Sequence, residues 1–178
     1  MTVELRVGPT PTGAPALDLR PWDDAGVKPL IDIYRDPALR RWTRVPVTGI
    51  EEAHRWLELQ RDGWRTGERL SFAVWETDRI VGHVVVKRTA GQADRAEVGY
   101  WTAAEVRGRG IASRALETLS GWAFATLTGV TRLELLHQVD NIASCRVAEK
   151  TGYVYQQTLP ARPPFPLDGH QHLRRAPR

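Results

Sequence analysis

The chain has 178 residues, of which 42% are hydrophobic and 26% are charged, and its formal net charge is +4. This composition is ordinary for one globular domain with its own core, so we expect a single domain over residues 1–178. No apolar run approaches the roughly 20 residues of a membrane span, and the N-terminus lacks a hydrophobic signal core. The single cysteine, Cys145, excludes an internal disulfide framework and favours a reducing, cytoplasmic location.

The positive charge comes mainly from arginine, which raises the question of nucleic-acid binding. The basic residues are scattered, however, and acidic residues such as Glu51 and Glu52 interrupt them. No stripe of aromatic residues runs among them, as it would on a surface that binds single strands. The pattern therefore favours an anionic cofactor and an acidic or ribosome-associated partner over a nucleic acid.

The first part of the chain predicts an irregular lead-in, one strand and two helices. Residues 1–15 are interrupted by prolines and glycines, and a strand is expected over residues 16–20. A helix is expected over residues 25–34, ended by the Asp36-Pro37 pair. Thr48 and Glu51 have the spacing of a capping box, which predicts a second helix reaching about residue 65.

The remainder predicts a meander of strands followed by helix–strand units, which together indicate a mixed α/β (α+β) sheet. A loop is expected over residues 90–94, and the tail over residues 159–178 is expected to hold a proline-rich loop before a last short strand, because proline cannot donate to a sheet ladder. The expected strands cover residues 70–75, 80–87, 96–101, 132–137, 153–158 and 170–174, and the expected helices cover residues 113–127 and 142–151.

A glycine-rich turn lies between the strand expected over residues 96–101 and the long helix that follows. It reads Arg107-Gly108-Arg109-Gly110-Ile111-Ala112. The first amides of a helix have no internal partner, and the helix dipole adds partial positive charge there. Glycine lets the backbone approach an anion closely, and the two arginines would add charge for a pyrophosphate. The turn therefore predicts a phosphate site, with a solvated basic loop before an ordinary amphipathic helix as the alternative.

A second motif starts at Asn141 and reads Asn-Ile-Ala-Ser-Cys-Arg-Val-Ala-Glu-Lys-Thr-Gly-Tyr. Taken with Arg107-x-x-Gly110-x-Ala112, the Asn141-x-x-Ser144 pair and the following Gly-Tyr turn resemble the motifs of the GCN5-related N-acetyltransferase (GNAT) family. The segments at residues 17–22 and 34–37 are similar to the branch that acetylates the N-terminal alanine or serine of ribosomal proteins. The resemblance covers roughly residues 17–155 of the chain.

This resemblance implies an acetyl-CoA-dependent N-acetyltransferase that transfers the acetyl group directly to a primary amine in a ternary complex. The acceptor would be a protein or peptide N-terminus, with a ribosomal protein as one candidate, or a small-molecule amine; no membrane is involved, and a homodimer is left open. The implied fold is a mostly antiparallel sheet with helices on both faces. Its fourth and fifth strands, here residues 96–101 and 132–137, splay into a V that holds the pantetheine arm. The implied cofactor-binding residues are Trp101, Thr102, Ala103, Arg107, Gly108, Arg109, Gly110, Ile111, Ala112, Asn141 and Ser144.

Acetyl transfer needs a neutral amine and a proton for the departing thiolate. Glu97 is the candidate base, because burial on the strand that borders the V would raise the pKa of its carboxyl. The resemblance suggests that Asn141 binds the pantetheine or a water while Ser144, one helical turn later, protonates the thiolate. Tyr155 is the other candidate acid. The structural alternatives are a surface glutamate for Glu97, a helix N-cap for Asn141 and a core tyrosine for Tyr155.

One departure from the family pattern supports an alternative function. Relatives in the N-terminal acetyltransferase branch often carry a glutamate soon after the Gly-Phe/Tyr turn, whereas here no carboxylate follows Tyr153 until Asp168. The alternative is a non-catalytic acyl-CoA sensor or a pseudo-enzyme interaction module. The histidines lack the spacing of a metal motif, so no metal is expected, and Cys145 is expected to be a buried structural thiol.

Overall fold

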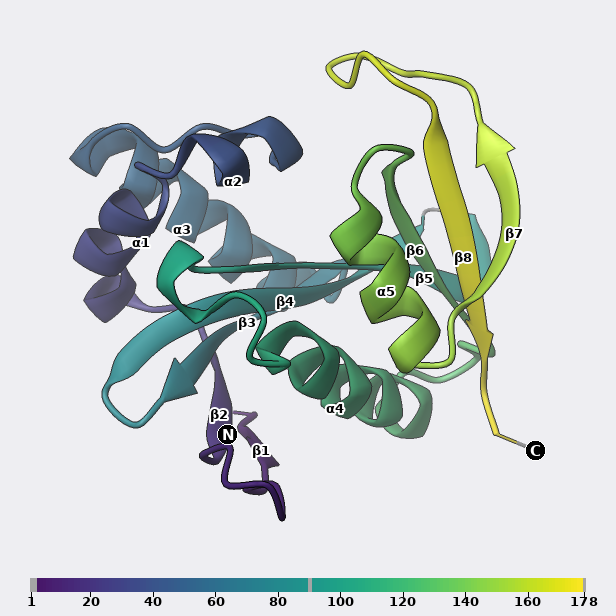
Figure 1. Ribbon diagram of the computed structural model, residues 1–178, viewed down its shortest axis with the longest axis horizontal. Coiled ribbons are helices and arrows are strands. Elements are labelled where there is room, and N and C mark those ends of the chain that lie inside the picture. The colour runs from purple at the N-terminus through teal and green to yellow at the C-terminus, as the bar shows by residue number, and fades with distance from the viewer. Residues whose placement is uncertain (1–2, 90, 178) are drawn as a thin grey trace.

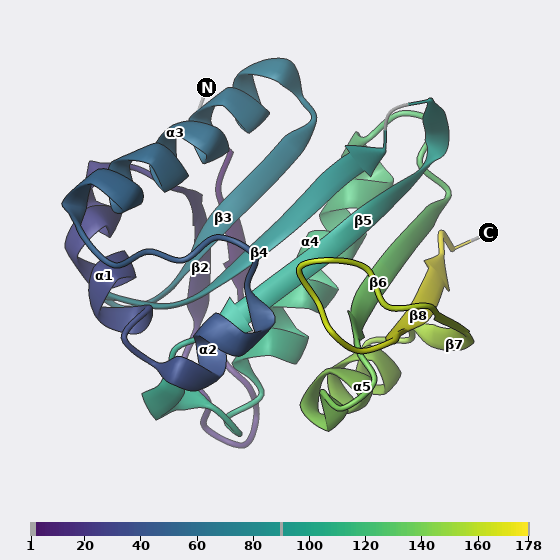
Figure 2. The same cartoon turned by 90° about the horizontal axis from the view of Figure 1, so that it is seen from above.

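The computed structural model describes residues 3–89 and 91–177 as a mixed sheet with helices on both faces (Figures 1 and 2). The strands of these residues follow the order β1-β2-β3-β4-β5-β6-β8-β7, and every neighbouring pair is antiparallel except β5 with β6. The strands are β1 (Leu5–Val7), β2 (Leu17–Pro21), β3 (Arg69–Glu76), β4 (Arg79–Thr89), β5 (Gln92–Thr102), β6 (Arg132–Gln138), β7 (Val154–Leu159) and β8 (Gly169–Arg175). The helices are α1 (Val27–Ile33), α2 (Pro37–Trp42), α3 (Ile50–Thr66), α4 (Ile111–Thr126) and α5 (Ile142–Lys150), with short 3₁₀ turns η1 (Asp24–Gly26) and η2 (Ala104–Val106).

The sheet separates two buried clusters, one under each helical layer. On one face, Leu116 and Leu119 of α4 pack in the same cluster as Val84 and Val98 of the central strands. On the other face, helices α1 to α3 cover a cluster rich in aromatic rings. Each fully buried large apolar side chain contributes about 1.5–3 kcal/mol, so both layers are held firmly to the strands between them. The mixed sheet with helices on both faces confirms the predicted fold class.

His83 lies at the centre of the aromatic cluster. Its Nδ1 accepts a hydrogen bond from Nε1 of Trp22 at 2.9 Å, and its ring stacks on Trp101 with 5.4 Å between centroids. Burial, reinforced by the charges of Arg69 and Lys87, lowers the pKa of His83 well below its usual value. His83 is therefore a hydrogen-bonded, neutral core histidine.

One prediction about a helix start was wrong, and one short helix, α2, was not predicted. Helix α3 begins at Ile50 with Gly49 as its N-cap and no capping side chain, so Thr48 does not form the predicted capping box. Asp36 ends the segment after α1 as expected, but it also starts α2, where its carboxylate accepts hydrogen bonds from the amides of Ala38 and Leu39. Proline suits the first position of a helix, because the amide it lacks would have had no partner.

The edges of the sheet also differ from the prediction. The lead-in contains β1, which pairs with β2 from Leu5 to Val7. Strand β5 begins at Gln92, so most of the loop expected over residues 90–94 is strand, while Ala90 lies outside the described residues. Among the described residues, no helix is both long and apolar enough to cross a bilayer.

The buried imidazole of His83 predicts a loss of stability in mild acid. The unfolded chain protonates this group near its ordinary pKa of about 6.5, whereas the folded chain keeps it neutral, so unfolding takes up a proton as the pH falls. The free energy of unfolding should fall by up to about 2 kcal/mol between pH 6.5 and pH 5 because of this one group. Urea unfolding of the wild type and of His83→Gln, which keeps an acceptor for Trp22, measures the difference. The exposed His54→Gln is the control, and an unchanged pH dependence in His83→Gln would contradict the prediction.

Candidate active site

Strands β5 and β6 pair at one end only. Their parallel pairing joins Arg95–Val98 to Arg132–Leu135 and stops there. Beyond that point β5 remains paired with β4 as far as Thr102, and β6 remains paired with β8 as far as Gln138. Each strand therefore keeps its outer partner and loses its inner one. This open end is the predicted V, and its two inner edges carry backbone groups that a third extended chain could pair with.

The glycine turn follows directly from the open end of β5. Gly108 and Gly110 have φ values of 77° and 76°, a left-handed conformation that side chains rarely adopt. Gly110 is the N-cap of α4, no side chain caps this helix, and a Cβ built at either glycine would meet no atom within 4 Å. The start of α4 therefore has no side-chain cap and an open turn before it, as a phosphate cradle requires.

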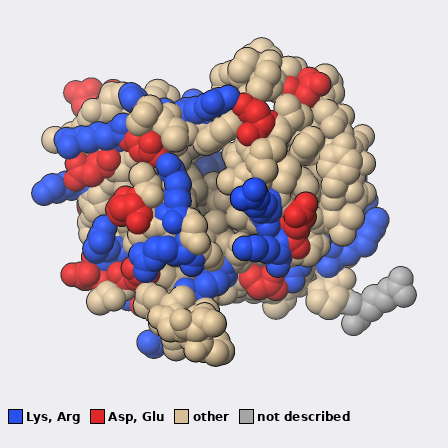
Figure 3. All heavy atoms as spheres, viewed as in Figure 1, with Lys and Arg blue, Asp and Glu red and all other residues tan. Residues whose placement is uncertain are grey.

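The two arginines of this turn already have carboxylate partners. Arg107 forms an ion pair with Asp36, and Arg109 donates to Glu76 at 2.7 Å. Burial pushes the pKa of Asp36 upward, but its bonds from Arg107 and from the α2 amides outweigh this and hold it below the usual value. Figure 3 shows basic and acidic side chains intermixed on this face rather than a single basic patch. The arginines are thus not free cations, and the uncapped backbone amides of α4 are the groups at the turn without a carboxylate partner.

The open end of β6 leads into α5, whose N-cap is Asn141. The Oδ1 atom of Asn141 accepts the amide of Ser144 at 3.2 Å, so its capping role is confirmed. The buried Ser144 Oγ accepts a 3.0 Å hydrogen bond from the hydroxyl of Tyr100 on β5. Burial raises the pKa of Tyr100 to about 12, so this hydroxyl stays protonated. The pair links β5 to α5, the helix that follows β6.

Tyr100 is the residue that sequence reasoning missed. It shares one face of β5 with the buried Ala96 and Val98, both of which belong to the α4 cluster. The alternation of the strand already placed it on that face, and the helix expected after the next strand carried Ser144. The sequence therefore contained one indication of this contact, namely a tyrosine near the end of a strand that borders the V and a serine on a helix predicted to lie beside the V.

Glu97 lies on the opposite face of β5, within the last paired residues before the V opens. It is registered against Lys87 of β4 and Glu134 of β6, and its carboxylate forms an ion pair with Lys87. Its side chain is 32% exposed. The structure thus places Glu97 beside a cation and water instead of in the dry sheet interior expected from the sequence.

Two other predicted site residues do not present their side chains to the V. The ring of Trp101 is buried against His83 and Tyr34, so only its backbone is available to a cofactor. Tyr155 lies on β7, with β8 and β6 between it and β5, and its hydroxyl bonds Thr158. It is 50% exposed, which also rules out the core-tyrosine alternative. Thr102 pairs with β4, and the buried Ala103 donates its amide to the carbonyl of Val81.

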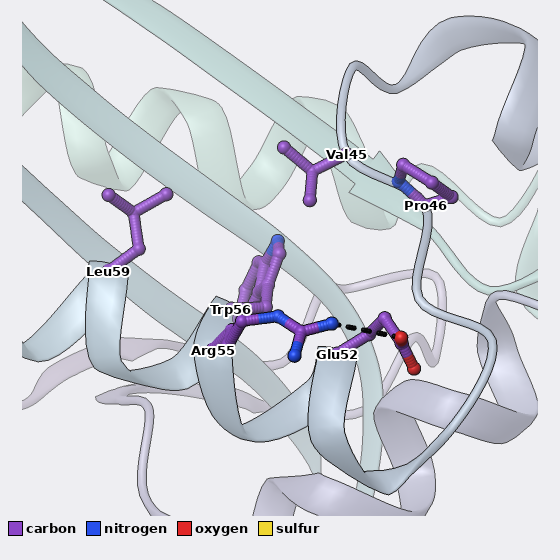
Figure 4. Close-up of a pocket in the computed structure, with 6 residues that line it drawn as sticks. All are labelled: Val45, Pro46, Glu52, Arg55, Trp56 and Leu59. Carbon is purple, nitrogen blue, oxygen red and sulfur yellow. Dashed lines mark hydrogen bonds and ion pairs between the residues drawn. The ribbon is translucent and has the colours of Figure 1, made fainter.

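A cavity of about 360 Å³ opens on the α1–α3 side of the sheet. The loop before α3 supplies Val45 and Pro46, and one side of α3 supplies the other lining residues (Figure 4). Trp56 forms the floor and packs edge-on against Trp22 of the aromatic cluster, while Glu52 and Arg55 pair at the rim. A smaller cavity of about 290 Å³ lies beside the start of α4, where Arg109, Ile111 and Arg114 face the loop at residues 12–15.

Comparison with known proteins supplies independent evidence. A family model described as the acetyltransferase (GNAT) domain matches residues 16–154. The chain is 26% identical over 134 residues to the uncharacterized N-acetyltransferase p20 of Bacillus licheniformis, a match that covers 74% of each protein. Its fold is similar to that of Mycobacterium smegmatis RimJ in complex with CoA-disulfide, with a TM-score of 0.77 and 24% identity over 98% of this chain and 87% of that one.

A second similar structure is a Salmonella typhimurium acetyl transferase described as modifying the N-terminal serine of 50S ribosomal subunit protein L7/L12. The TM-score is 0.79 and the identity is 19%, over 90% of this chain and 95% of that one. The family model spans most of this chain, including the parted strands, the glycine turn and the start of the Asn141 helix. The protein therefore belongs to the GNAT acetyltransferase family and is an acyltransferase.

Proposed function

We propose that this protein is an acetyl-CoA-dependent N-acetyltransferase that transfers the acetyl group directly to a primary amine. The main support for the proposal is the set of strand ends and helix N-termini that lie at the open end of the V. The carboxyl ends of two parallel strands lead there into two helix N-termini, and ligands of open α/β sheets bind at such ends. The uncapped start of α4 suits the pyrophosphate, and the free inner edges of β5 and β6 suit the amides of a pantetheine arm.

The faces of β5 separate the two proton transfers that the reaction needs. Glu97 lies on the α1–α3 face, where it would accept the proton of the amine directly or through water. Ser144 and Tyr100 lie on the α4–α5 face. Because Ser144 Oγ accepts a hydrogen bond from the hydroxyl of Tyr100, its own hydroxyl hydrogen is free to be donated to the departing thiolate. The thioester would lie between these groups, in the gap that the strands leave.

We further propose that the acceptor is the α-amino group of a protein, with a ribosomal protein as the first candidate. The neighbour that modifies a ribosomal N-terminal serine supports this choice. An α-amino group has a pKa near 7.7–8.0, so a useful fraction is neutral at physiological pH and Glu97 would need to deprotonate only the remainder. The cavity beside α3 opens on the same face as Glu97 and offers an apolar floor for a side chain near the acceptor amine.

The proposal is tested by following thiol release from acetyl-CoA in the presence of peptides with different N-terminal residues, and of polyamines and aminoglycosides. Peptides with a free N-terminus should release thiol, and the same peptides with a blocked N-terminus should not. Binding of acetyl-CoA with no thiol release across the whole panel would favour the sensor or pseudo-enzyme alternative. No binding at micromolar acetyl-CoA would end both.

The phosphate cradle predicts a specific loss on changing Gly110→Glu. A carboxylate at the N-cap of α4 would occupy the space and repel the charge intended for a phosphate. The Michaelis constant for acetyl-CoA should rise by about tenfold or more, while Arg107→Ala should have a milder effect because the backbone amides remain.

The control for this prediction is Gly67→Glu. Gly67 ends α3 with a φ of 73° and open space around it, so the substitution carries the same backbone strain far from the turn. An equal effect of the two substitutions on the Michaelis constant would mean that strain, not phosphate binding, is responsible.

The Tyr100–Ser144 pair predicts a loss of turnover without a loss of cofactor affinity. Ser144→Ala removes the proton donor and should lower kcat by about a hundredfold, within the usual range for acid–base catalysis. Tyr100→Phe should lower it less, because the serine hydroxyl remains. The matched control is Tyr153→Phe, which breaks a chemically similar buried bond of 2.7 Å to Ser120 in the core. Tyr153→Phe should reduce stability and leave kcat unchanged; a similar fall in kcat would remove the case for Ser144.

The proposed role of Glu97 as the general base predicts a pH-dependent loss of turnover in Glu97→Gln. This change keeps the shape of the side chain but removes the proton acceptor, so turnover should fall about a hundredfold at neutral pH. The deficit should shrink at higher pH, where more of the amine is already neutral. Glu134→Gln is the control, because Glu134 stands opposite Glu97 in the register and bonds Arg95 instead. Wild-type turnover of Glu97→Gln near pH 7 would leave deprotonation to solvent.

A further inference from the structure

Three of the five histidines meet the only cysteine behind the β6 wall of the V. The antiparallel register of β6 and β8 sets His137 opposite His170 and Leu135 opposite His172, so the three imidazoles share one face of the sheet. Cys145 of α5 packs over that face, and one ligand atom from each of the four residues lies within 4.8 Å of the other three. Cys145 is only half-buried, so the isolated buried thiol expected from the sequence is corrected.

Three distances within this cluster match those of a tetrahedral metal site. Zinc bonds of about 2.0–2.1 Å to nitrogen and about 2.3 Å to sulfur give ligand separations of about 3.3 Å between two nitrogens and about 3.6 Å between nitrogen and sulfur. Cys145 Sγ lies 3.6 Å from His137 Nε2 and 3.5 Å from His170 Nδ1. His137 Nε2 and His172 Nε2 are 3.2 Å apart. These three contacts already have the spacing of a metal site, and the other ligand separations, up to 4.8 Å, would have to shorten on binding.

The hydrogen bonds around the cluster also prepare it for a metal. His137 Nδ1 lies 2.8 Å from the carbonyl oxygen of Gln138, so this nitrogen carries the proton and Nε2 presents its lone pair to the cluster. A backbone carbonyl in this position is the usual partner of a metal-bound histidine. The ring of Tyr155 packs edge-on against His170 and His172, which shields the cluster from the β7 side.

We propose that His137, Cys145, His170 and His172 form a structural zinc site. Imidazole and thiolate together favour zinc among the abundant divalent ions, and four protein ligands leave no open position for substrate. On binding, the Cys145 S–H bond breaks, its proton leaves to solvent and the sulfur bonds the metal. The sequence did not show this site, because its ligands come from three separate elements. The proposal does not depend on the identity of the acetyl acceptor.

The test uses the full-length chain without a histidine tag, stripped with a chelator and titrated with zinc and, separately, with cobalt. One zinc ion should bind per chain and raise the melting temperature. Cobalt should give the intense visible bands of four-coordinate geometry and a thiolate-to-cobalt charge-transfer band in the near ultraviolet. Absence of stoichiometric zinc binding, or a weak six-coordinate cobalt spectrum without the thiolate band, would overturn the proposal.

Variants then assign the ligands. Cys145→Ala should abolish the thiolate band, and both it and His172→Ala should weaken zinc binding by at least about tenfold. His54→Ala is the control, because His54 is exposed on α3 and outside the cluster. Far-ultraviolet circular dichroism shows whether each variant is folded. If a variant is not folded, the cobalt spectrum of the wild type still tests whether the site exists. Zinc binding that survives both ligand variants unchanged would place the metal elsewhere.

Discussion

The end of the β5–β6 pairing is the constraint on which the rest of the site depends. Four residue pairs join the strands, and past Val98 and Leu135 the inner edges separate. The outer partners β4 and β8 continue, so both walls stay rigid while their inner backbone groups lack a strand partner (Figure 2). Unpaired edges of this kind are usually blunted or covered in proteins. Here the free edge of β5 begins at Gly99, directly after the last residue that pairs with β6.

The two arginines of the glycine turn are already paired with carboxylates, so an incoming anion would exchange with these partners instead of meeting a patch of free positive charge. Arg107 and Arg109 are each half-exposed and bound to a carboxylate, from Asp36 of α2 and Glu76 of β3. Exposed pairs of this kind contribute only about 0–1 kcal/mol, so an arriving phosphate could take over either arginine at small cost. The same pairs tie the turn to α2 and β3 when no anion is bound. The amides of α4, which have no competing partner, would therefore provide the constant part of anion recognition.

Local patterns in the sequence predicted most of the fold, because they are set by residues close together in the chain. Alternation located the central strands, and the glycines of the turn located the start of α4 within two residues. The errors occurred at helix boundaries, where the local sequence was compatible with more than one assignment. Asp36 both follows α1 and caps α2, and Gly49, not Thr48, took the N-cap of α3. Nothing local distinguished these outcomes.

The site itself was less predictable, because its contacts join elements far apart in sequence. Asn141 and Ser144 were found from their spacing, but Tyr100 became visible only when β5 and α5 met across the V. Tyr155 was predicted as the other candidate acid, yet the strand order places β7 at the outer edge of the sheet. The pairing of β6 with β8, which brings the histidines together, is equally non-local.

Helix α5 is the element that connects these features, because consecutive side chains in its first turn reach opposite walls. Ser144 reaches across the V to Tyr100 on β5, while Cys145 contacts the histidines of β6 and β8. Asn141 fixes the start of the helix by capping it. A shift of α5 would therefore alter the bond across the V and the cluster behind β6 together. The width of the V at the reacting end thus depends on how firmly that first turn is held. A metal ion behind β6 would hold it without taking part in the chemistry.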